Sequence, residues 1–137
     1  INDNMSIYVA SRVIKAMLAK GLQPGTARIL VLGLTFKENC PDVRNTKVVD
    51  VVAELASYGG TVDVHDPWVD PAEAKEEYGI DLVADPEKGA YDVVVIAVGH
   101  RQFQALGADG IRAYCKDNSV LYDIKYVLAP DEVDDRL

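Results

Sequence analysis

The stretch YDVVVIAV, residues 91–98, constrains the fold more than any other part of the sequence. It is apolar on both faces, as the central strands of a parallel sheet are, because helices cover such strands on both sides. Parallel strands need a crossover between them, and helix-like segments alternate with strand-like ones along this chain. The sequence therefore predicts an α/β fold with a parallel sheet between two layers of helices.

The remaining elements follow from apolar periodicity and from turn residues. Strands are expected over 27–33, 61–66, 80–83 and 119–125, and helices over 47–59, 71–79 and 101–114. The helix over 47–59 has Asn45 or Thr46 as its N-cap and Gly59 or Gly60 as its stop. The ending PDEVDDRL, residues 130–137, is predicted to be a charged tail.

A long amphipathic helix is expected before this pattern, over residues 3–20, closed by Gly21 and Pro24. It precedes the strand–helix alternation and is expected to stand outside it. Its apolar positions are Met5, Ile7, Val9, Val13, Ile14, Met17 and Leu18. They cover more than one stripe, so one face is expected to pack on the domain and the rest to form an interface, most simply a homodimer through residues 3–20.

Charge and cysteine usage exclude several function classes. The 137 residues carry a net charge of −8, which argues against nucleic acid or an anionic membrane as a partner. No apolar stretch has membrane-spanning length. Cys40 and Cys115 lie far apart in no metal-binding spacing, so free thiols in a reducing, cytoplasmic setting are expected, and no metal site.

The loop after the first strand, residues 33–46, is the expected ligand site, because such sheets bind ligands at the carboxyl ends of their strands. It begins at Gly33 but lacks the further glycines of a phosphate-binding turn. Lys37 and Arg44 offer positive charge instead, next to a helix N-terminus that favours anions. On a solvated loop, however, these two cations can equally pair with the neighbouring acids at 38 and 42.

Several segments together resemble one family. They are GLTFK at 33–37, DVR at 42–44, DP at 66–67, INDNM at 1–5, VVVIAVGHRQFQAL at 93–106 and VLYDIK at 120–125. The chain is similar over nearly its whole length to the UDP-binding, C-terminal domain of the UDP-glucose/GDP-mannose dehydrogenase family. The segments TFKENCPDVRNT and VDVHDPW resemble the branch that acts on UDP-N-acetylhexosamines more than the UDP-glucose branch.

The resemblance implies a Rossmann-like domain at residues 25–137, with residues 1–24 as part of the central helix that joins two domains and packs across a dimer. It also implies an NAD-dependent UDP-sugar 6-dehydrogenase, which oxidises the C6 alcohol to a uronate for surface polysaccharide synthesis. Two hydride transfers proceed through a thiohemiacetal and a thioester on a catalytic cysteine. That cysteine belongs to the N-terminal part, so this chain is expected to be an inactive fragment with no catalytic residue, and Cys40 to pack the loop.

Site roles also follow from the resemblance. Phe36 and Lys37 match the pair that contacts the UDP-sugar, and Arg44 matches the residue that reaches across the domain cleft to the NAD pyrophosphate. A guanidinium suits a pyrophosphate because it offers a rigid fork of donors. NAD is expected to be held mainly by the N-terminal NAD-binding domain, which is this chain's own partner. The resemblance leaves open which UDP-sugar is used.

Other polar residues near the strand ends are weaker candidates for a role in ligand binding. Asp66 occupies the place of a ribose-binding acid, but a structural role in the turn before Pro67 is favoured. His65 is expected to be a half-buried strand residue. His100 and Arg101 follow the central strand, and functional and solvated roles are equally open for both.

One alternative comes from a different class, a non-catalytic module of flavodoxin-like shape that binds a nucleotide or a partner protein. Asp63, Asp66 and Asp123 at strand ends suggest a phosphoacceptor site, with Lys125 after the last strand. The first strand, however, ends in Val-Leu-Gly and supplies no acid. The dehydrogenase interpretation is therefore preferred.

Overall fold

The computed structural model describes residues 3–137 and contains one five-stranded parallel sheet in the order β2-β1-β3-β4-β5. The strands are β1 (Arg28–Leu32), β2 (Thr61–His65), β3 (Tyr91–Ile96), β4 (Cys115–Asp123) and β5 (Asp135–Arg136). The order reverses direction between β1 and β3, which lie side by side at the centre. The expected α/β, Rossmann-like fold with a parallel sheet is confirmed.

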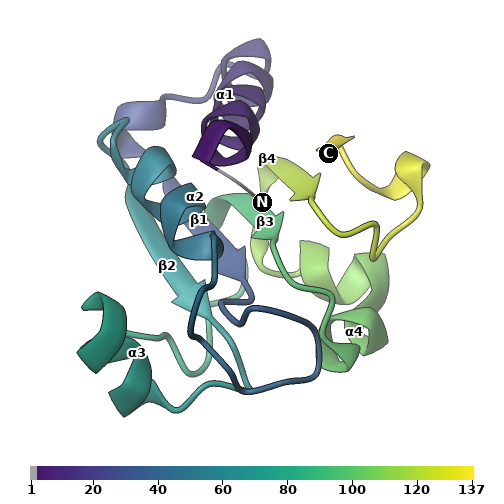
Figure 1. Cartoon of the computed structure of the whole chain (residues 1–137). Helices are drawn as coiled ribbons and strands as arrows, with labels where there is room; N and C mark the ends of the chain where they lie inside the picture. The colour runs from purple at the N-terminus through teal and green to yellow at the C-terminus, as the bar shows by residue number, and fades with distance from the viewer. Residues whose placement is uncertain (1–2) are drawn as a thin grey trace.

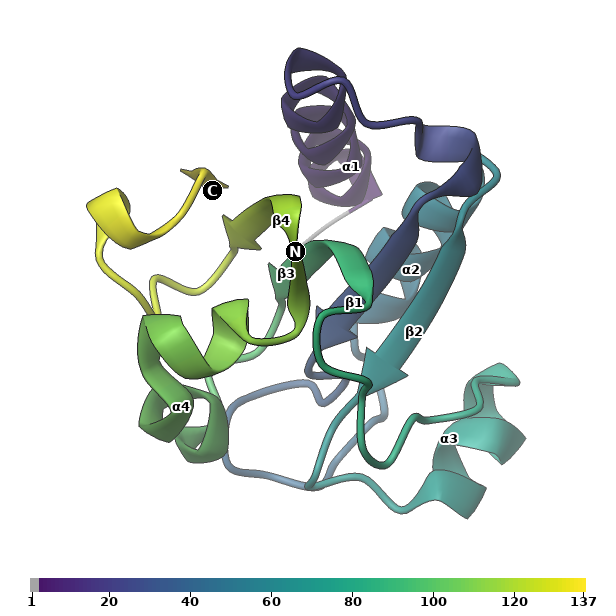
Figure 2. The ribbon, with the colours of Figure 1, turned by 180° about the vertical axis from the view of Figure 1, so that it is seen from behind.

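Helices cover both faces of this sheet. They are α1 (Asp3–Ala19), α2 (Val48–Ala56), α3 (Pro71–Tyr78) and α4 (Arg101–Arg112), with short 3-10 turns at Pro24–Thr26 and Pro130–Glu132. In Figure 1, α2 lies in front of β1 and β2, and in the reverse view of Figure 2 these strands lie in front. No helix among residues 3–137 is long and apolar enough to cross a membrane.

Each face of the sheet has its own apolar core because successive strand residues point to opposite faces. Val93 and Val95 of β3 pack with α1 and α2, whereas Val94 and Ile96 pack with α4. All six residues of β3 are buried. The apolar run from which the fold was predicted is thus the centre of both cores.

The helix α1 precedes the strand–helix alternation, and one of its faces belongs to the domain's own core. Val9, Val13, Ile14 and Met17 are buried with residues of α2 and the sheet. Ile7 and Leu18 remain 54% and 58% exposed. One face therefore packs on the domain as expected, and a narrower apolar stripe than expected faces outward.

Two segments differ from their predictions. Residues 80–83 form only an isolated bridge between Leu82 and Val64, so the expected strand there is wrong. The expected charged tail instead forms the 3-10 turn and β5. Its order comes from the carboxylate of Asp134, which accepts hydrogen bonds from Lys20 at 2.7 Å and from the backbone amide of Leu121 at 2.7 Å.

Helix boundaries also shift slightly. The predicted helix over 47–59 is shorter, and its N-cap is Lys47, although the Thr46 hydroxyl accepts the Val48 amide at 3.2 Å. The last predicted strand begins earlier, at Cys115. The stretch 101–114 is helical to Arg112 with a break at Gly107, where φ is 65°.

Gly33 is the one position where the ligand loop requires glycine. Its φ is +104°, and a Cβ there would lie 2.5 Å from the Cβ of Val98 and 2.9 Å from the Val98 backbone nitrogen. The loop can therefore leave β1 beside β3 only because this residue has no side chain.

Gly33→Ala is expected to lower the free energy of unfolding by about 3 kcal/mol or more, since overpacking adds to the cost of a left-handed backbone. Gly79→Ala is the matched control, with φ +67° but nothing within 4 Å of the added Cβ. It should cost only about 1–2 kcal/mol. Urea denaturation of both variants measures the difference, and equal losses would contradict the close-approach explanation.

Candidate functional site

The loop of residues 33–46 lies at the point where the strand order reverses, which is the usual ligand site of open α/β sheets. In Figure 1 it runs in dark blue across the lower end of the molecule, between β1 and α2. Two buried apolar side chains, Leu34 and Val43, fix its two halves to the core. The Phe36 amide donates to the Asp42 carbonyl at 2.9 Å and closes the loop between them.

A buried carboxylate, that of Asp66 at the end of β2, holds the start of this loop. Its Oδ2 accepts from the backbone amides of Leu34 at 2.7 Å and Thr35 at 3.2 Å, and from Nε2 of His100 at 2.9 Å. Its Oδ1 accepts from the Trp68 amide at 2.8 Å. Both oxygens accept hydrogen bonds, so the predicted structural role in the turn is confirmed, and the side chain is 0% exposed and therefore out of reach of a ribose.

His100 is the second buried polar residue of the site, and its side chain is 0% exposed. Its Nδ1 lies 2.9 Å from the Asn39 amide nitrogen, and its Nε2 lies 3.2 Å from the Thr35 hydroxyl. The solvated interpretation of His100 is therefore wrong. The imidazole instead connects the loop after β3 to the loop after β1.

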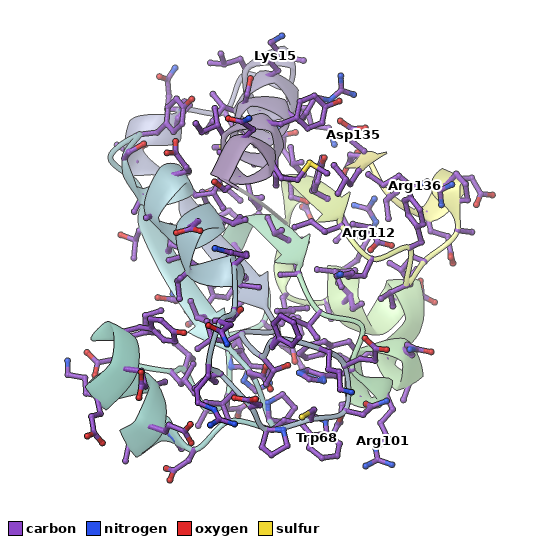
Figure 3. All side chains as sticks on the ribbon, viewed as in Figure 1. Lys15, Trp68, Arg101, Arg112, Asp135 and Arg136 are labelled. Atoms are coloured by element: carbon purple, nitrogen blue, oxygen red, sulfur yellow. The ribbon has the colours of Figure 1, made fainter. Side chains whose placement is uncertain are left out.

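The start of α4 is attached to the same loop from outside. The Arg101 amide donates to the Asn39 side-chain oxygen at 2.9 Å. The Arg101 guanidinium lies 4.8 Å from the centre of the Trp68 ring, and the indole nitrogen donates to Gln102 at 2.8 Å. Figure 3 shows Trp68 and Arg101 together at the lower end of the molecule. His65, by contrast, is half-buried as predicted and faces the Val83 carbonyl at 2.8 Å.

The two residues predicted to contact a UDP-sugar project from this fixed frame. Phe36 is 61% exposed, although its own backbone amide is hydrogen-bonded. Lys37 is exposed and forms no salt bridge within residues 3–137. The expected alternative in which Lys37 pairs with Glu38 does not occur, and its ammonium group is available to an anion.

Arg44 is placed differently, on the arm of the loop that leads to α2. Its guanidinium pairs with Asp42 at 3.1 Å, so the alternative ion pair does occur for this residue. The side chain is still 75% exposed. Arg44 therefore keeps donors for a second anion, beside a hollow of about 380 Å³ that Pro41, Asp42 and Glu73 also line.

A second hollow, of about 290 Å³, opens on the other side of the loop. Its lining comes from three strand-end segments, with the residues Glu38, Gly99, Gln104, Lys125, Tyr126 and Val127. The loop of residues 33–46 thus lies between two hollows, with Phe36 and Lys37 at its tip.

The aspartates that suggested a phosphoacceptor site in the flavodoxin-like alternative do not lie together. Asp63 accepts from the Tyr91 hydroxyl at 2.7 Å, and buried Asp123 accepts from the amides of Lys125 and Leu128 at 3.0 and 2.9 Å. Within the described residues there is no group of three side chains that could hold a metal ion. The geometry therefore provides no phosphoacceptor pocket.

Sequence reasoning found the loop but missed what fixes it. Asp66 and His100 follow the two strands that flank β1, so their proximity was implied by the strand order once this was known. Asn39, which joins His100 to Arg101, has no signal in the sequence. Its φ of 56° in the left-handed region, which asparagine tolerates, is the only local reason for its identity.

The fold and the loop define a class of domain, an open α/β nucleotide-binding domain whose switch-point loop carries exposed side chains in place of glycines. A profile described as the UDP-glucose/GDP-mannose dehydrogenase family, UDP binding domain, matches residues 30–130. The chain therefore belongs to that family.

Relatives of this chain support the UDP-N-acetylhexosamine branch, which the sequence of the loop indicated. UDP-N-acetyl-D-glucosamine 6-dehydrogenases of Pseudomonas aeruginosa and Salmonella typhi are 53% and 50% identical over all 137 residues. The chain spans 32% of the length of each. Among solved structures, an NDP-N-acetyl-D-galactosaminuronic acid dehydrogenase from Methanosarcina mazei is 27% identical with a TM-score of 0.81, over 96% of this chain and 27% of that one.

Asp66→Asn should lower the free energy of unfolding by about 2–4 kcal/mol at neutral pH, because it removes a buried charge that four donors surround. The exposed Asp81, paired with Lys75 on the surface, provides the control. Asp81→Asn should change stability by less than about 0.5 kcal/mol. Urea denaturation measures both.

A comparison of the native protein with Asp66→Asn also tests how the free energy of unfolding depends on pH. Burial raises the pKa of Asp66, but hydrogen bonds from His100, Leu34 and Trp68 outweigh it, so the pKa falls below its ordinary value of 3.8. A lowered pKa stabilises the fold above the unfolded-state pKa, and this stability is lost as pH falls through the folded-state pKa. The gap between native protein and Asp66→Asn should therefore narrow below about pH 4. A gap that stays constant into stronger acid would contradict the argument.

Proposed function

We propose that this chain is the substrate-binding, C-terminal portion of an NAD-dependent nucleotide-sugar 6-dehydrogenase. Its substrate is a UDP-N-acetylhexosamine, whose C6 alcohol the whole enzyme oxidises to a carboxylate. The observation that carries the proposal is the loop of residues 33–46, which holds exposed Phe36 and an unpaired Lys37 on a buried hydrogen-bonded base. Relatives named for this activity, 50% and 53% identical over the whole chain, support the substrate class.

Phe36 and Lys37 suit a nucleotide sugar by their chemistry. An exposed aromatic ring offers a face to a base or sugar, and an unpaired ammonium is a flexible point charge for a phosphate. The amides of Leu34 and Thr35, which a glycine-rich loop would offer to phosphate, already donate to Asp66. Anion binding at this loop therefore depends on side-chain charge.

Within residues 3–137 we assign one NAD contact, to Arg44. Its guanidinium can pair with a pyrophosphate, although Asp42 and Glu73 lie beside it. NAD accepts the hydride in such a reaction, and we assign its main binding surface to a separate N-terminal domain. In the whole enzyme Arg44 contributes one contact across the cleft.

The cysteines of this chain do not suit the nucleophile of an alcohol oxidation. Burial raises the pKa of the Cys115 thiol, which lowers its thiolate fraction, and Cys115 begins β4 at the end of the sheet opposite the loop. Cys40 is also free, but it lies in the loop of residues 33–46, whereas the family resemblance implies a catalytic cysteine in the N-terminal part of the enzyme. We propose that the chain alone reduces no NAD, and because both thiols are free we assign the reaction to the cytoplasm.

In the whole enzyme, Lys37→Ala is expected to raise KM for the UDP-sugar and Arg44→Ala to raise KM for NAD. Each loses one charge-assisted contact worth about 1.5–3 kcal/mol, or roughly ten- to a hundred-fold. Steady-state kinetics with each substrate varied in turn measures the split. The exposed Lys88, before β3, is the control, and Lys88→Ala should change neither constant.

Two outcomes would contradict this division of roles. One is that both substitutions raise KM for the same substrate. The other is that the 137-residue chain by itself forms NADH from a UDP-sugar, which would place the nucleophile in this chain.

We further propose that α1 (Asp3–Ala19) belongs to a central helix that joins two domains, that the UDP-sugar domain spans residues 25–137, and that α1 forms a homodimer. The helical segment was predicted over residues 1–24, of which residues 1 and 2 lie outside the described part of the chain. Ile7 and Leu18 lie three helical turns apart on one face and are both more than half exposed, with Tyr8 beside them at 51%. A stripe of this kind usually marks an interface, and a two-fold contact is the simplest way to cover it.

The chain is expected to sediment as a dimer at tens of micromolar, and a variant with both Ile7→Ser and Leu18→Ser as a monomer. Leu106→Ser is the control, because Leu106 is 39% exposed on α4, away from α1. Sedimentation equilibrium distinguishes the states. A monomeric native chain, or a dimer that persists in the double variant, would refute the interface.

A further inference from the structure

His100 is fully buried, and the proposed function assigns it no contact with a ligand. Its ring is nevertheless hydrogen-bonded on both nitrogens, to Asp66 and to the Asn39 amide, and packs against Phe103 with ring centres 5.5 Å apart. A buried titratable group with two specific partners can control the segment that it holds.

The partners fix the tautomer of this ring. The Asn39 backbone N–H can only donate, so Nδ1 carries a lone pair and no proton. Nε2 therefore carries the proton and donates to the Asp66 carboxylate. Thr35 agrees with this assignment, because its hydroxyl donates to the Lys37 carbonyl at 2.8 Å and its oxygen is left to accept from Nε2.

The two contacts of the ring lie on either side of the proposed ligand residues. Thr35 precedes Phe36 and Lys37 and is held through Asp66, and Asn39 follows them and is held through Nδ1. Nδ1 thus holds the backbone on the far side of the tip, where the Arg101 amide holds only the Asn39 side chain. This inference rests on the proposed function, in which that tip contacts a UDP-sugar.

We propose that His100 is a positioning residue for the substrate loop: its neutral Nε2–H form clamps Asn39, and protonation at Nδ1 releases the loop tip and weakens UDP-sugar binding. A proton on Nδ1 faces the Asn39 N–H with a second donor, so that hydrogen bond is lost. The bond from Nε2 to Asp66 is kept, because a cationic ring still donates to a carboxylate. Release is therefore confined to the tip.

The charged and titratable groups around the His100 ring are consistent with loss of the Asn39 hydrogen bond alone. From β2, Asp66 faces Nε2 directly. From α4, the Arg101 guanidinium lies beyond the Trp68 ring, which is 6.0 Å from the imidazole. From the loop, Lys37 and Glu38 are exposed. From β2, the His65 ring lies 6.1 Å from the ring of Phe103, which also packs against His100. Asp66 is thus the charged group that contacts the ring directly.

The native chain allows a direct test because it contains only two histidines, His65 and His100. Nitrogen-15 NMR should find them in opposite tautomers, His100 with the proton on Nε2 and His65 with the proton on Nδ1, which donates to the Val83 carbonyl. As the pH is lowered, hydrogen exchange of the Asn39 amide should accelerate as His100 becomes protonated. The Leu34 amide, which donates to Asp66, should stay protected. The proposal would be overturned if neutral His100 carried its proton on Nδ1. It would also be overturned if the exchange rate of the Asn39 amide did not change when His100 is protonated.

Two substitutions separate the contacts of the ring. His100→Asn keeps an acceptor toward Asn39 and does not titrate, so Asn39 protection and the affinity for UDP-N-acetylglucosamine should become independent of pH. His100→Gln keeps a donor toward Asp66 but offers nothing at the Nδ1 position, so this affinity should fall on the order of ten-fold at every pH. Calorimetric titration with UDP-N-acetylglucosamine measures both, because its diphosphate, unlike the terminal phosphate of UDP, has no ionisation at about pH 6. Equal affinity of the two variants would overturn the proposal.

The exchange and calorimetric readouts distinguish the two levels of inference. If the exchange of the Asn39 amide follows protonation of His100 but UDP-N-acetylglucosamine binds at no pH, the clamp stands and the proposed ligand is wrong. If UDP-N-acetylglucosamine binds with an affinity that does not change with pH and the exchange of the Asn39 amide does not follow His100, the ligand stands and the clamp is wrong.

Discussion

The buried carboxylate of Asp66 is the interaction on which the ligand end of this domain depends. Three backbone amides and one imidazole N–H converge on it, from the loops after β1, β2 and β3. Three loops that would otherwise be independent become one unit, because removal of a charge with four donors leaves each donor unpaired. The rigidity of the site thus comes from one side chain at the end of one strand.

This arrangement explains how the loop manages without a glycine-rich turn. In such a turn, free amides face the phosphate. Here the corresponding amides of Leu34 and Thr35 face an internal anion, and only Gly33 remains, because β3 leaves no room for a side chain. The loop is therefore free to carry Phe36 and Lys37 outward. Exposed side chains can be exchanged without disturbing the frame, which suits a family with several nucleotide-sugar substrates.

The layered fold was predictable because its signals are local. The apolar run of β3, the alternation of helices and strands and the amphipathic period of α1 each lie within one segment. The predictions that failed depend on distant partners. Residues 80–83 read as a strand but have only one bridge, and the acidic C-terminus becomes ordered because Asp134 meets Lys20 and the Leu121 amide.

The candidate site divides in the same way. The loop and its exposed residues could be found from motif and strand order, whereas the burial of His100 could not, because a histidine after a strand is equally often solvated. Asn39 has no sequence signal, since its role depends on a left-handed backbone and on two partners from beyond the loop. The exposed residues of the loop were easier to predict than the buried residues that hold the loop in place.

The central claim, that the loop of residues 33–46 receives the nucleotide sugar, is tested most directly by mapping UDP onto the isotopically labelled chain. Backbone amide shifts should change saturably at Phe36, Lys37 and their neighbours, and at the start of α4 through Asn39 and Arg101. Changes centred instead on the apolar hollow beside β2, near Val69 and Leu82, would contradict the claim. So would the absence of saturable shifts at millimolar UDP.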